Sequence, residues 1–216
     1  MRPNAVMYLL SAGFAVAGNF FSEMAVAQGY SDCGNPFQNA YGPYDYRTAT
    51  DQQKHLVEIT GAHFTTSVET LRSGNTGTLG GELDYTLRVF PNHTRALMAM
   101  VRLGQRDKTI KPQGAQYTVE CYVERAVKFR PDDPDAWLVR GIYHSMHNKY
   151  KEAIADFGAV VERQPDHANG HYNLGLAYFE TKDYDNARKE AKLAQSLGFP
   201  LQGLKKKLQA MRKWDE

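Results

Sequence analysis

The chain has little of several features that mark specialised protein classes. Two cysteines in 216 residues are too few for a disulfide-dense scaffold or an all-cysteine zinc site. Basic and acidic residues nearly balance, 26 against 24, and the net charge of +2 lacks the basic excess of a dedicated nucleic-acid binder. With 42% hydrophobic and 23% charged residues, the composition excludes a disordered chain and a multi-span membrane protein.

Catalytic and metal-binding motifs are missing as well. The sequence contains no G-x-x-x-x-G-K-[ST], G-x-G-x-x-G, G-x-S-x-G, H-E-x-x-H or C-x-x-C. The glycine-rich run 74–81 lacks the lysine of a phosphate-binding loop and is interpreted as a connection between helices. Two histidine pairs, His144 with His147 and His167 with His171, have no obvious third ligand nearby. We therefore expect no enzyme, no metal and no cofactor.

Residues 1–27 differ from the rest of the chain. Arg2 is their only basic residue, residues 5–17 are apolar or small, and residues 25–27 have the small-x-small pattern of a signal-peptidase site. The stretch is shorter than the ~20 apolar residues that a spanning helix needs. We expect a signal peptide that is cleaved near Ala27, no membrane span, and an exported protein that is periplasmic or secreted. The alternative is a buried helix of the fold.

A repeat of 34 residues organises the C-terminal half. Four residues recur with the same identity 34 positions later: Pro131 as Pro165, Gly141 as Gly175, Tyr150 as Tyr184, and Ala153 as Ala187. Together with Trp137 and Phe157, this pattern resembles the tetratricopeptide repeat family, whose signature is W-x2-L-G-x2-Y, then A-x3-F, then P. The resemblance implies stacked pairs of antiparallel helices, because one pair cannot bury its apolar face alone.

The family resemblance implies an all-α fold, namely an α-solenoid over residues 52–216 with about four helix pairs. We expect helices near 52–71 and 82–90, near 94–103 and 116–130, and then within the repeats 135–165 and 169–199. An insertion falls in the polar stretch 104–114. The amphipathic stretch 201–214 is expected to cap the solenoid. Residues 28–51 are rich in tyrosine, glycine and proline without helical periodicity, and they predict an irregular, extended N-terminal arm.

The two cysteines connect the arm to the repeats in this interpretation. Cys33 lies in the arm, and Cys121 lies in the second helix of the second pair. In the repeat frame, Cys121 points about 200° away from a core-facing position, toward the outer surface. Because an even pair usually bonds in an oxidising compartment, we expect a Cys33–Cys121 disulfide that holds the arm on the convex face. Two free thiols or a covalent dimer are the alternatives.

The resemblance also implies a working surface. In tetratricopeptide proteins, fixed positions of each first helix line the concave face. Carried over to this chain, these positions include Arg95, Met98, Arg102, Leu138, Ile142, Tyr172, Asn173, Leu176 and Phe179. This lining is basic at one end and apolar to aromatic elsewhere, which is typical of a receptor for a peptide or helix. Coverage of these residues by the arm or by a neighbouring helix is the alternative.

Two functional hypotheses follow. The first is a non-enzymatic protein–protein interaction module, a scaffold or assembly factor of the cell envelope, that binds a protein segment in the concave groove. The second is a carbohydrate- or small-ligand-binding protein that uses the tyrosine-rich arm, in which case some arm tyrosines face a ligand rather than pack on the repeats.

Overall fold

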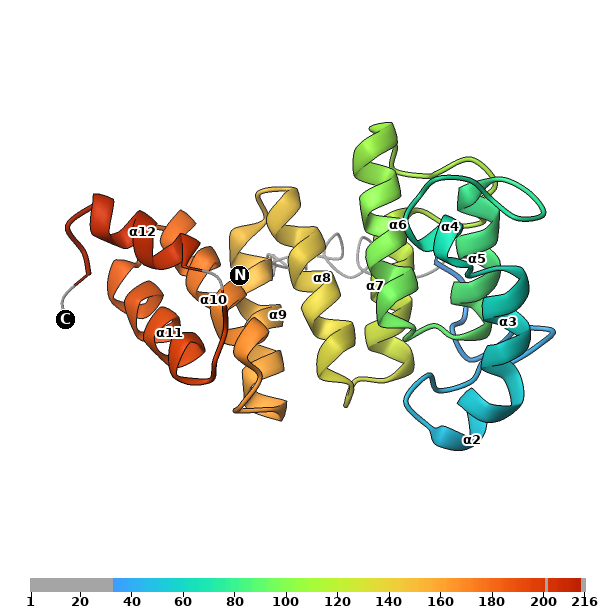
Figure 1. The fold of residues 1–216 in the computed structure, drawn as a ribbon, viewed down its shortest axis with the longest axis horizontal. Coiled ribbons are helices and arrows are strands. Elements are labelled where there is room, and N and C mark those ends of the chain that lie inside the picture. Colours follow the sequence, from blue (N-terminus) through green and yellow to red (C-terminus); the bar gives the residue numbers. More distant parts are fainter. Residues whose placement is uncertain (1–32, 201, 215–216) are drawn as a thin grey trace, which may run out of the picture. The chain divides into compact units, whose positions relative to one another are not determined.

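The computed structural model describes residues 33–200 and 202–214 (Figure 1). Within these ranges the chain is helical and contains no strand, which confirms the all-α prediction. The predicted signal peptide over 1–27 and the first residues of the arm lie outside the described residues. None of the described helices has both the length and the apolar character needed to cross a membrane.

The first helix pair is irregular. Its first half consists of α2 (Ala49–Asp51), the π-helical segment η1 (Gln52–Leu56), α3 (Val57–Ala62) and the short α4 (Thr66–Glu69). Its second half is α5 (Leu79–Val89). The single helix expected over 52–71 is therefore interrupted after α3. There, buried Phe64 joins the core and the Thr65 side chain caps α4 by accepting a hydrogen bond from the Val68 amide.

The following three pairs are regular. The second pair is α6 (Thr94–Asp107) with α7 (Val119–Phe129), and the third is α8 (Pro134–Met146) with α9 (Tyr150–Arg163). The fourth is α10 (Ala168–Glu180) with α11 (Tyr184–Ser196). Finally, α12 (Gly203–Ala210) packs against α10 and α11, where the sequence predicts a cap. Neighbouring pairs lie side by side from α6 to α12, as in a helical solenoid (Figure 1).

The repeated glycine has a packing role. A Cβ at Gly141 would lie 2.5 Å from Cε1 of Phe157, whose side chain is buried between α8 and α9. At the equivalent position one repeat later, a Cβ at Gly175 would lie 2.7 Å from Cδ2 of Leu204 in α12. Glycine therefore permits the close approach of neighbouring helices at this position.

The turn that follows the first helix of each regular pair contains a left-handed residue. These residues are Lys108, Asn148 and Lys182, with φ of 51°, 58° and 65°. A residue with a Cβ costs roughly 1–2 kcal/mol in this region, whereas glycine adopts it readily. The turn is thus fixed by the pairing of the helices and not by the local preference of the residue.

We expect Lys182→Gly to raise the free energy of unfolding by about 1 kcal/mol, since glycine relieves the left-handed strain. The matched control is Lys189→Gly, at an exposed position inside α11, which should lower it by about 1 kcal/mol. Urea unfolding of both variants measures the two changes. Losses of equal size in both would contradict the prediction.

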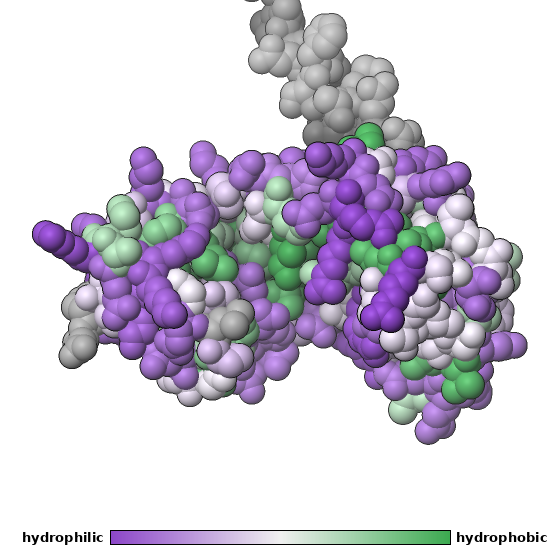
Figure 2. All heavy atoms as spheres, turned by 45° about the horizontal axis from the view of Figure 1, so that its top comes forward, coloured by the Kyte–Doolittle hydropathy of each residue, from purple (hydrophilic) through white to green (hydrophobic). Residues whose placement is uncertain are grey.

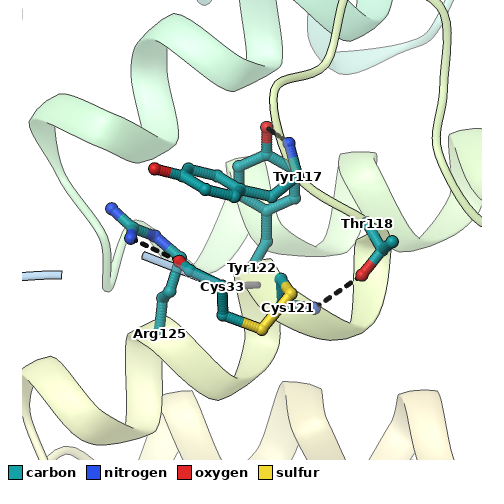
Figure 3. The surroundings of a disulfide bond; sticks show 6 residues. All are labelled: Cys33, Tyr117, Thr118, Cys121, Tyr122 and Arg125. Carbon is teal, nitrogen blue, oxygen red and sulfur yellow. Dashed lines mark hydrogen bonds between the residues drawn. A yellow bond between two sulfur atoms is a disulfide. The ribbon is translucent and has the colours of Figure 1, made fainter. Parts of the chain in front are cut away.

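The arm packs on the second helices α5 and α7. Cys33 and Cys121 form the predicted disulfide, with an S–S distance of 2.02 Å. Figure 3 shows Arg125 beside this bond, where its Nη1 donates a hydrogen bond to the Cys33 carbonyl oxygen at 2.8 Å. Further along, the ring of Phe37 contacts that of Phe129 at a centroid distance of 5.7 Å. Cys121 is 6% exposed, because the arm covers this side of α7.

A buried polar network holds the end of the arm. The Asn92 side chain donates hydrogen bonds to Oδ1 of Asp45 at 2.7 Å and to Oδ2 of Asp133 at 2.9 Å. Burial would raise the pKa of Asp45, but hydrogen bonds from Arg47 and Asn92 outweigh burial and lower that pKa. The network joins the arm to the turns that precede α6 and α8.

The glycine-rich run 74–81 is ordered by one carboxylate. Residues 79–81 already belong to α5, and the preceding loop folds around Glu82. Its Oε1 accepts hydrogen bonds from three successive backbone amides, those of Asn75, Thr76 and Gly77. Its Oε2 lies 2.7 Å from Nδ1 of His63. The connection between the helices is therefore tied to the buried Glu82 side chain.

We expect acid to remove the stabilisation that Glu82 provides. Burial alone would raise its pKa, but hydrogen bonds from Thr76 and His63 outweigh burial and lower the pKa from its usual 4.5. A lowered folded-state pKa stabilises the fold above pH 4.5, and this stabilisation is lost as the pH falls through the lowered value.

Glu82→Gln should therefore be less stable than wild type near neutral pH and lose less stability on acidification below about pH 5. Urea unfolding at a series of pH values measures this difference. Glu162→Gln, on the exposed surface of α9, should keep the wild-type pH dependence. If the free energy of unfolding fell equally with acid for Glu82→Gln and for wild type, Glu82 would not be the source of this pH dependence.

Candidate functional site

The predicted groove begins on α6 with two arginines in different situations. Arg95 forms an ion pair with Glu69 of α4, so its guanidinium group is already engaged. Arg102 is exposed, and its side chain has no hydrogen bond or ion pair within the described part of the chain. Met98 is half-buried between them and packs against the core. Arg102 is therefore the groove cation that can bind an incoming anion.

The α8 positions divide between core and surface. Leu138 is 5% exposed and belongs to the core cluster with Phe157 and Leu174, because α9 and α10 pack around it. It offers no surface to a partner, which differs from the sequence prediction. Ile142 is half-buried at the edge of the same cluster and keeps part of its side chain accessible.

The α10 positions are partly covered by the cap. The ring of Tyr172 stacks on that of Phe199 at 4.4 Å, and Phe179 lies under the Lys207 ammonium group at 5.1 Å. Leu176 packs into the same cluster beneath α12. The Asn173 amide group donates to the carbonyl oxygen of the preceding turn at 2.8 Å. These four side chains are half-buried, so a neighbouring helix covers this end of the predicted groove in part.

A pocket of about 260 Å³ lies where α6 and α8 end. Its wall includes Gln105 near the end of α6 and Met146 at the end of α8. The remaining side chains that matter here are Val101, Lys108, Ile110, Val119, Tyr143 and His147. In Figure 2, which looks toward this end of the helices, hydrophobic side chains gather in a hollow between hydrophilic flanks. A volume of this size suits one or two apolar side chains of a partner.

The pocket combines an apolar wall with basic groups nearby. Ile110 is 74% exposed, which is unusual for a large apolar side chain. Lys108 lines the pocket, is exposed, and forms no ion pair within the described residues. Arg102 lies one helical turn before Gln105 of the pocket wall. Burial and the nearby Glu120 raise the pKa of Tyr143, so its hydroxyl stays neutral. The arrangement favours an apolar side chain next to a carboxylate.

Sequence reasoning missed the loop part of this pocket. Lys108 and Ile110 lie in the insertion that interrupts the 34-residue frame, and only positions inside the frame carry over from the family. A signal was nevertheless present, because Ile110 is an isolated large apolar residue in an otherwise polar stretch.

The histidine pairs serve the packing of the repeats. Nδ1 of His144 lies 2.8 Å from Asp156, and Nδ1 of His171 lies 2.6 Å from Glu190. His167 caps α10 by accepting a hydrogen bond from a backbone amide. Across the described ranges, no group of three or more potential metal ligands comes together.

Two half-buried tyrosines of the arm stack on histidine rings. The ring of Tyr44 stacks on His55 at 3.8 Å, and the ring of Tyr46 stacks on His93 at 3.9 Å. Burial lowers the pKa of His93 to about 3, so this ring is neutral. Tyr41 differs from the other two because it lines a separate pocket.

In comparisons with known proteins, the C-terminal half of the chain matches a repeat family. Residues 144–198, from the end of α8 to the end of α11, match the family model described as Tetratricopeptide repeat. Superkiller complex protein 3 of Mus musculus is 36% identical over 62 residues, which cover 29% of this chain and 4% of that protein. E3 ubiquitin-protein ligase CHIP of Arabidopsis thaliana is 28% identical over 80 residues, which cover 37% of this chain and 28% of that protein.

The matches thus span less than a third of either relative. They agree with the helix pairs described above and support a tetratricopeptide-repeat protein with an α-solenoid fold. Repeats of this family indicate a protein–protein interaction module.

Proposed function

We propose that this tetratricopeptide-repeat chain is a non-enzymatic module that binds a protein segment along α6, α8 and α10. The observation that carries the proposal is the pocket at the ends of α6 and α8, with its exposed Ile110 and its unpaired Lys108. A bound segment would place an apolar side chain in the pocket and an Asp or Glu beside Arg102. Unpaired guanidinium and ammonium groups at the edge of an apolar surface favour such a ligand.

We further propose that the module acts outside the cytosol, as a scaffold or assembly factor of the cell envelope. The signal-peptidase pattern at residues 25–27 supports export. The Cys33–Cys121 disulfide supports an oxidising compartment, since such bonds are rare in the cytosol of mesophiles. Fractionation of cells that produce the full chain, with the N-terminus of the mature protein determined, tests this part. An intact chain in the cytosol would end it.

A peptide-display selection tests the groove. We expect the wild-type protein to enrich segments with an apolar residue next to Asp or Glu. Binding of the enriched peptides should fall about tenfold or more with Arg102→Glu and with Ile110→Asp. Lys151→Glu, a charge reversal on the exposed surface of α9, is the matched control and should leave binding unchanged. Peptides that bind both groove variants as well as wild type would place the binding surface elsewhere.

A further inference from the structure

We propose that a second pocket, between the arm and the first helix pair, binds an organic ammonium group. This pocket has a volume of about 290 Å³ and is lined by Tyr41, Glu58, Ile59, Ala62, His63 and Tyr85. Two phenol rings and an imidazole give it aromatic surface, and Glu58 supplies a carboxylate to its wall. The proposal concerns residues outside the groove and goes beyond the function proposed above.

Tyr41 and Glu58 form the polar side of this pocket. The Tyr41 hydroxyl donates to Oε2 of Glu58 at 3.0 Å, and its oxygen lies 2.7 Å from Nδ1 of His55. Burial and the bond to Glu58 raise the pKa of Tyr41 to about 12, so the phenol is neutral. Its hydroxyl proton already takes part in the hydrogen bond to Glu58. Glu58 is exposed and has no ion pair within the described residues. Its carboxylate therefore keeps lone pairs for a ligand that donates.

His63 adds an aromatic ring on the other side of the pocket. Its Nδ1 lies 2.7 Å from the Glu82 carboxylate, whose pKa is lowered. This contact holds the imidazole ring in the wall of the pocket. The ring also packs against Tyr85 at a centroid distance of 4.1 Å. This face of the pocket therefore offers aromatic surface.

The charges around the pocket favour a cation. Among the described residues, neither lysine nor arginine lines its wall. Arg88 lies 5.7 Å from the ring centroid of Tyr85, but its Nε donates to Asp84 at 2.9 Å, so its charge is paired. Aromatic faces attract an ammonium ion by about 0.5–2 kcal/mol, more strongly where water is excluded. A sugar needs donors as well as acceptors, and the Tyr41 hydroxyl already donates to Glu58.

Titration of the full-length protein with small probes tests the inference. Tetramethylammonium and butylammonium should each give saturable shifts in the tyrosine and histidine NMR signals, whereas tert-butyl alcohol should not. Glu58→Gln and Tyr85→Leu should weaken ammonium binding by about tenfold, and Glu162→Gln on α9 should not change it. Arg102→Glu should also leave this binding unchanged, which separates the result from any failure of the groove.

Three results would overturn the inference. They are the absence of saturation with both ammonium probes, full binding by Glu58→Gln, and binding of glucose at least as tight as that of the ammonium probes. Because Glu58 is exposed, its substitution leaves the fold intact, and a circular-dichroism spectrum verifies this. The Glu58→Gln result therefore tests the proposed ammonium site even if Tyr85→Leu does not fold.

Discussion

Loss of the Cys33–Cys121 disulfide is expected to lower the free energy of unfolding by about 4–5 kcal/mol. The two cysteines are 88 positions apart, and a cross-link that closes so long a loop removes much of the conformational entropy of the unfolded chain. Few single changes in this protein should have a larger effect, because the bond also holds the arm against α5 and α7.

The surroundings of the bond reinforce the effect. Arg125 is 3% exposed, and its Nε has no hydrogen-bond partner among the residues that the structure describes. Its charge is compensated by the Cys33 carbonyl oxygen and by the ring of Tyr117, 4.5 Å from the guanidinium carbon (Figure 3). Burial lowers the pKa of Arg125, so the folded state holds this charge at a cost. Removal of the disulfide weakens the contact with Cys33 that offsets this cost.

Urea unfolding of wild type, with and without reductant, measures the stabilisation by the bond. The double substitution of Cys33 and Cys121 by serine should match the reduced wild type and show no response to reductant. A change of less than about 1 kcal/mol in the wild type would show that the bond contributes little.

The Asp156→Ala substitution is expected to lower the free energy of unfolding by about 3–5 kcal/mol. Asp156 of α9 is 2% exposed and accepts hydrogen bonds from Nε and Nη2 of Arg140 at 3.1 and 2.6 Å. Its other oxygen lies 2.8 Å from Nδ1 of His144. Within the described part of the chain, alanine leaves the partly buried guanidinium group of Arg140 with Glu124 as its remaining ionic partner, at 2.9 Å.

The expected loss comes from an uncompensated charge between helices. Arg140 and His144 project from α8 toward α9, so the Asp156 carboxylate joins the two helices of the third pair. Asp185→Ala is the matched control, because that carboxylate is 89% exposed and pairs with Arg188 on the surface of α11. Differential scanning calorimetry should show a much lower unfolding temperature for Asp156→Ala and little change for the control. Equal effects would mean that burial of the pair does not matter.

The regular repeats could be predicted closely because their signals are local. Pro131 and Pro165 each follow the end of a second helix, since proline lacks the N–H that a helix needs and disfavours helix before it. Gly141 and Gly175 mark the close approaches of neighbouring helices. These residues act through contacts at a fixed sequence spacing, so the 34-residue period carries the information.

The first pair and the arm could be predicted only in outline. The interruption after α3 depends on Phe64 reaching a core that is built mainly by α5 to α8. The order of the glycine-rich loop depends on a single carboxylate, that of Glu82. Neither contact repeats along the chain, so the sequence periodicity does not predict either of them.

The candidate groove shows the same division. Arg102 and Ile142 could be placed from the repeat frame, and both keep accessible surface. The burial of Leu138 and the contribution of Ile110 to the pocket could not, because both depend on how neighbouring pairs and an insertion pack.

By itself, the amino-acid sequence determined the helix pairs, their period, the capping helix and the two cysteines available for a cross-link. Only the tertiary structure decided which groove side chains remain exposed, where the arm packs and where pockets form. The physical reason is the range of the interactions. Helix pairing within a repeat depends on residues fewer than 34 positions apart, whereas the pockets and the arm depend on contacts between segments far apart in the chain.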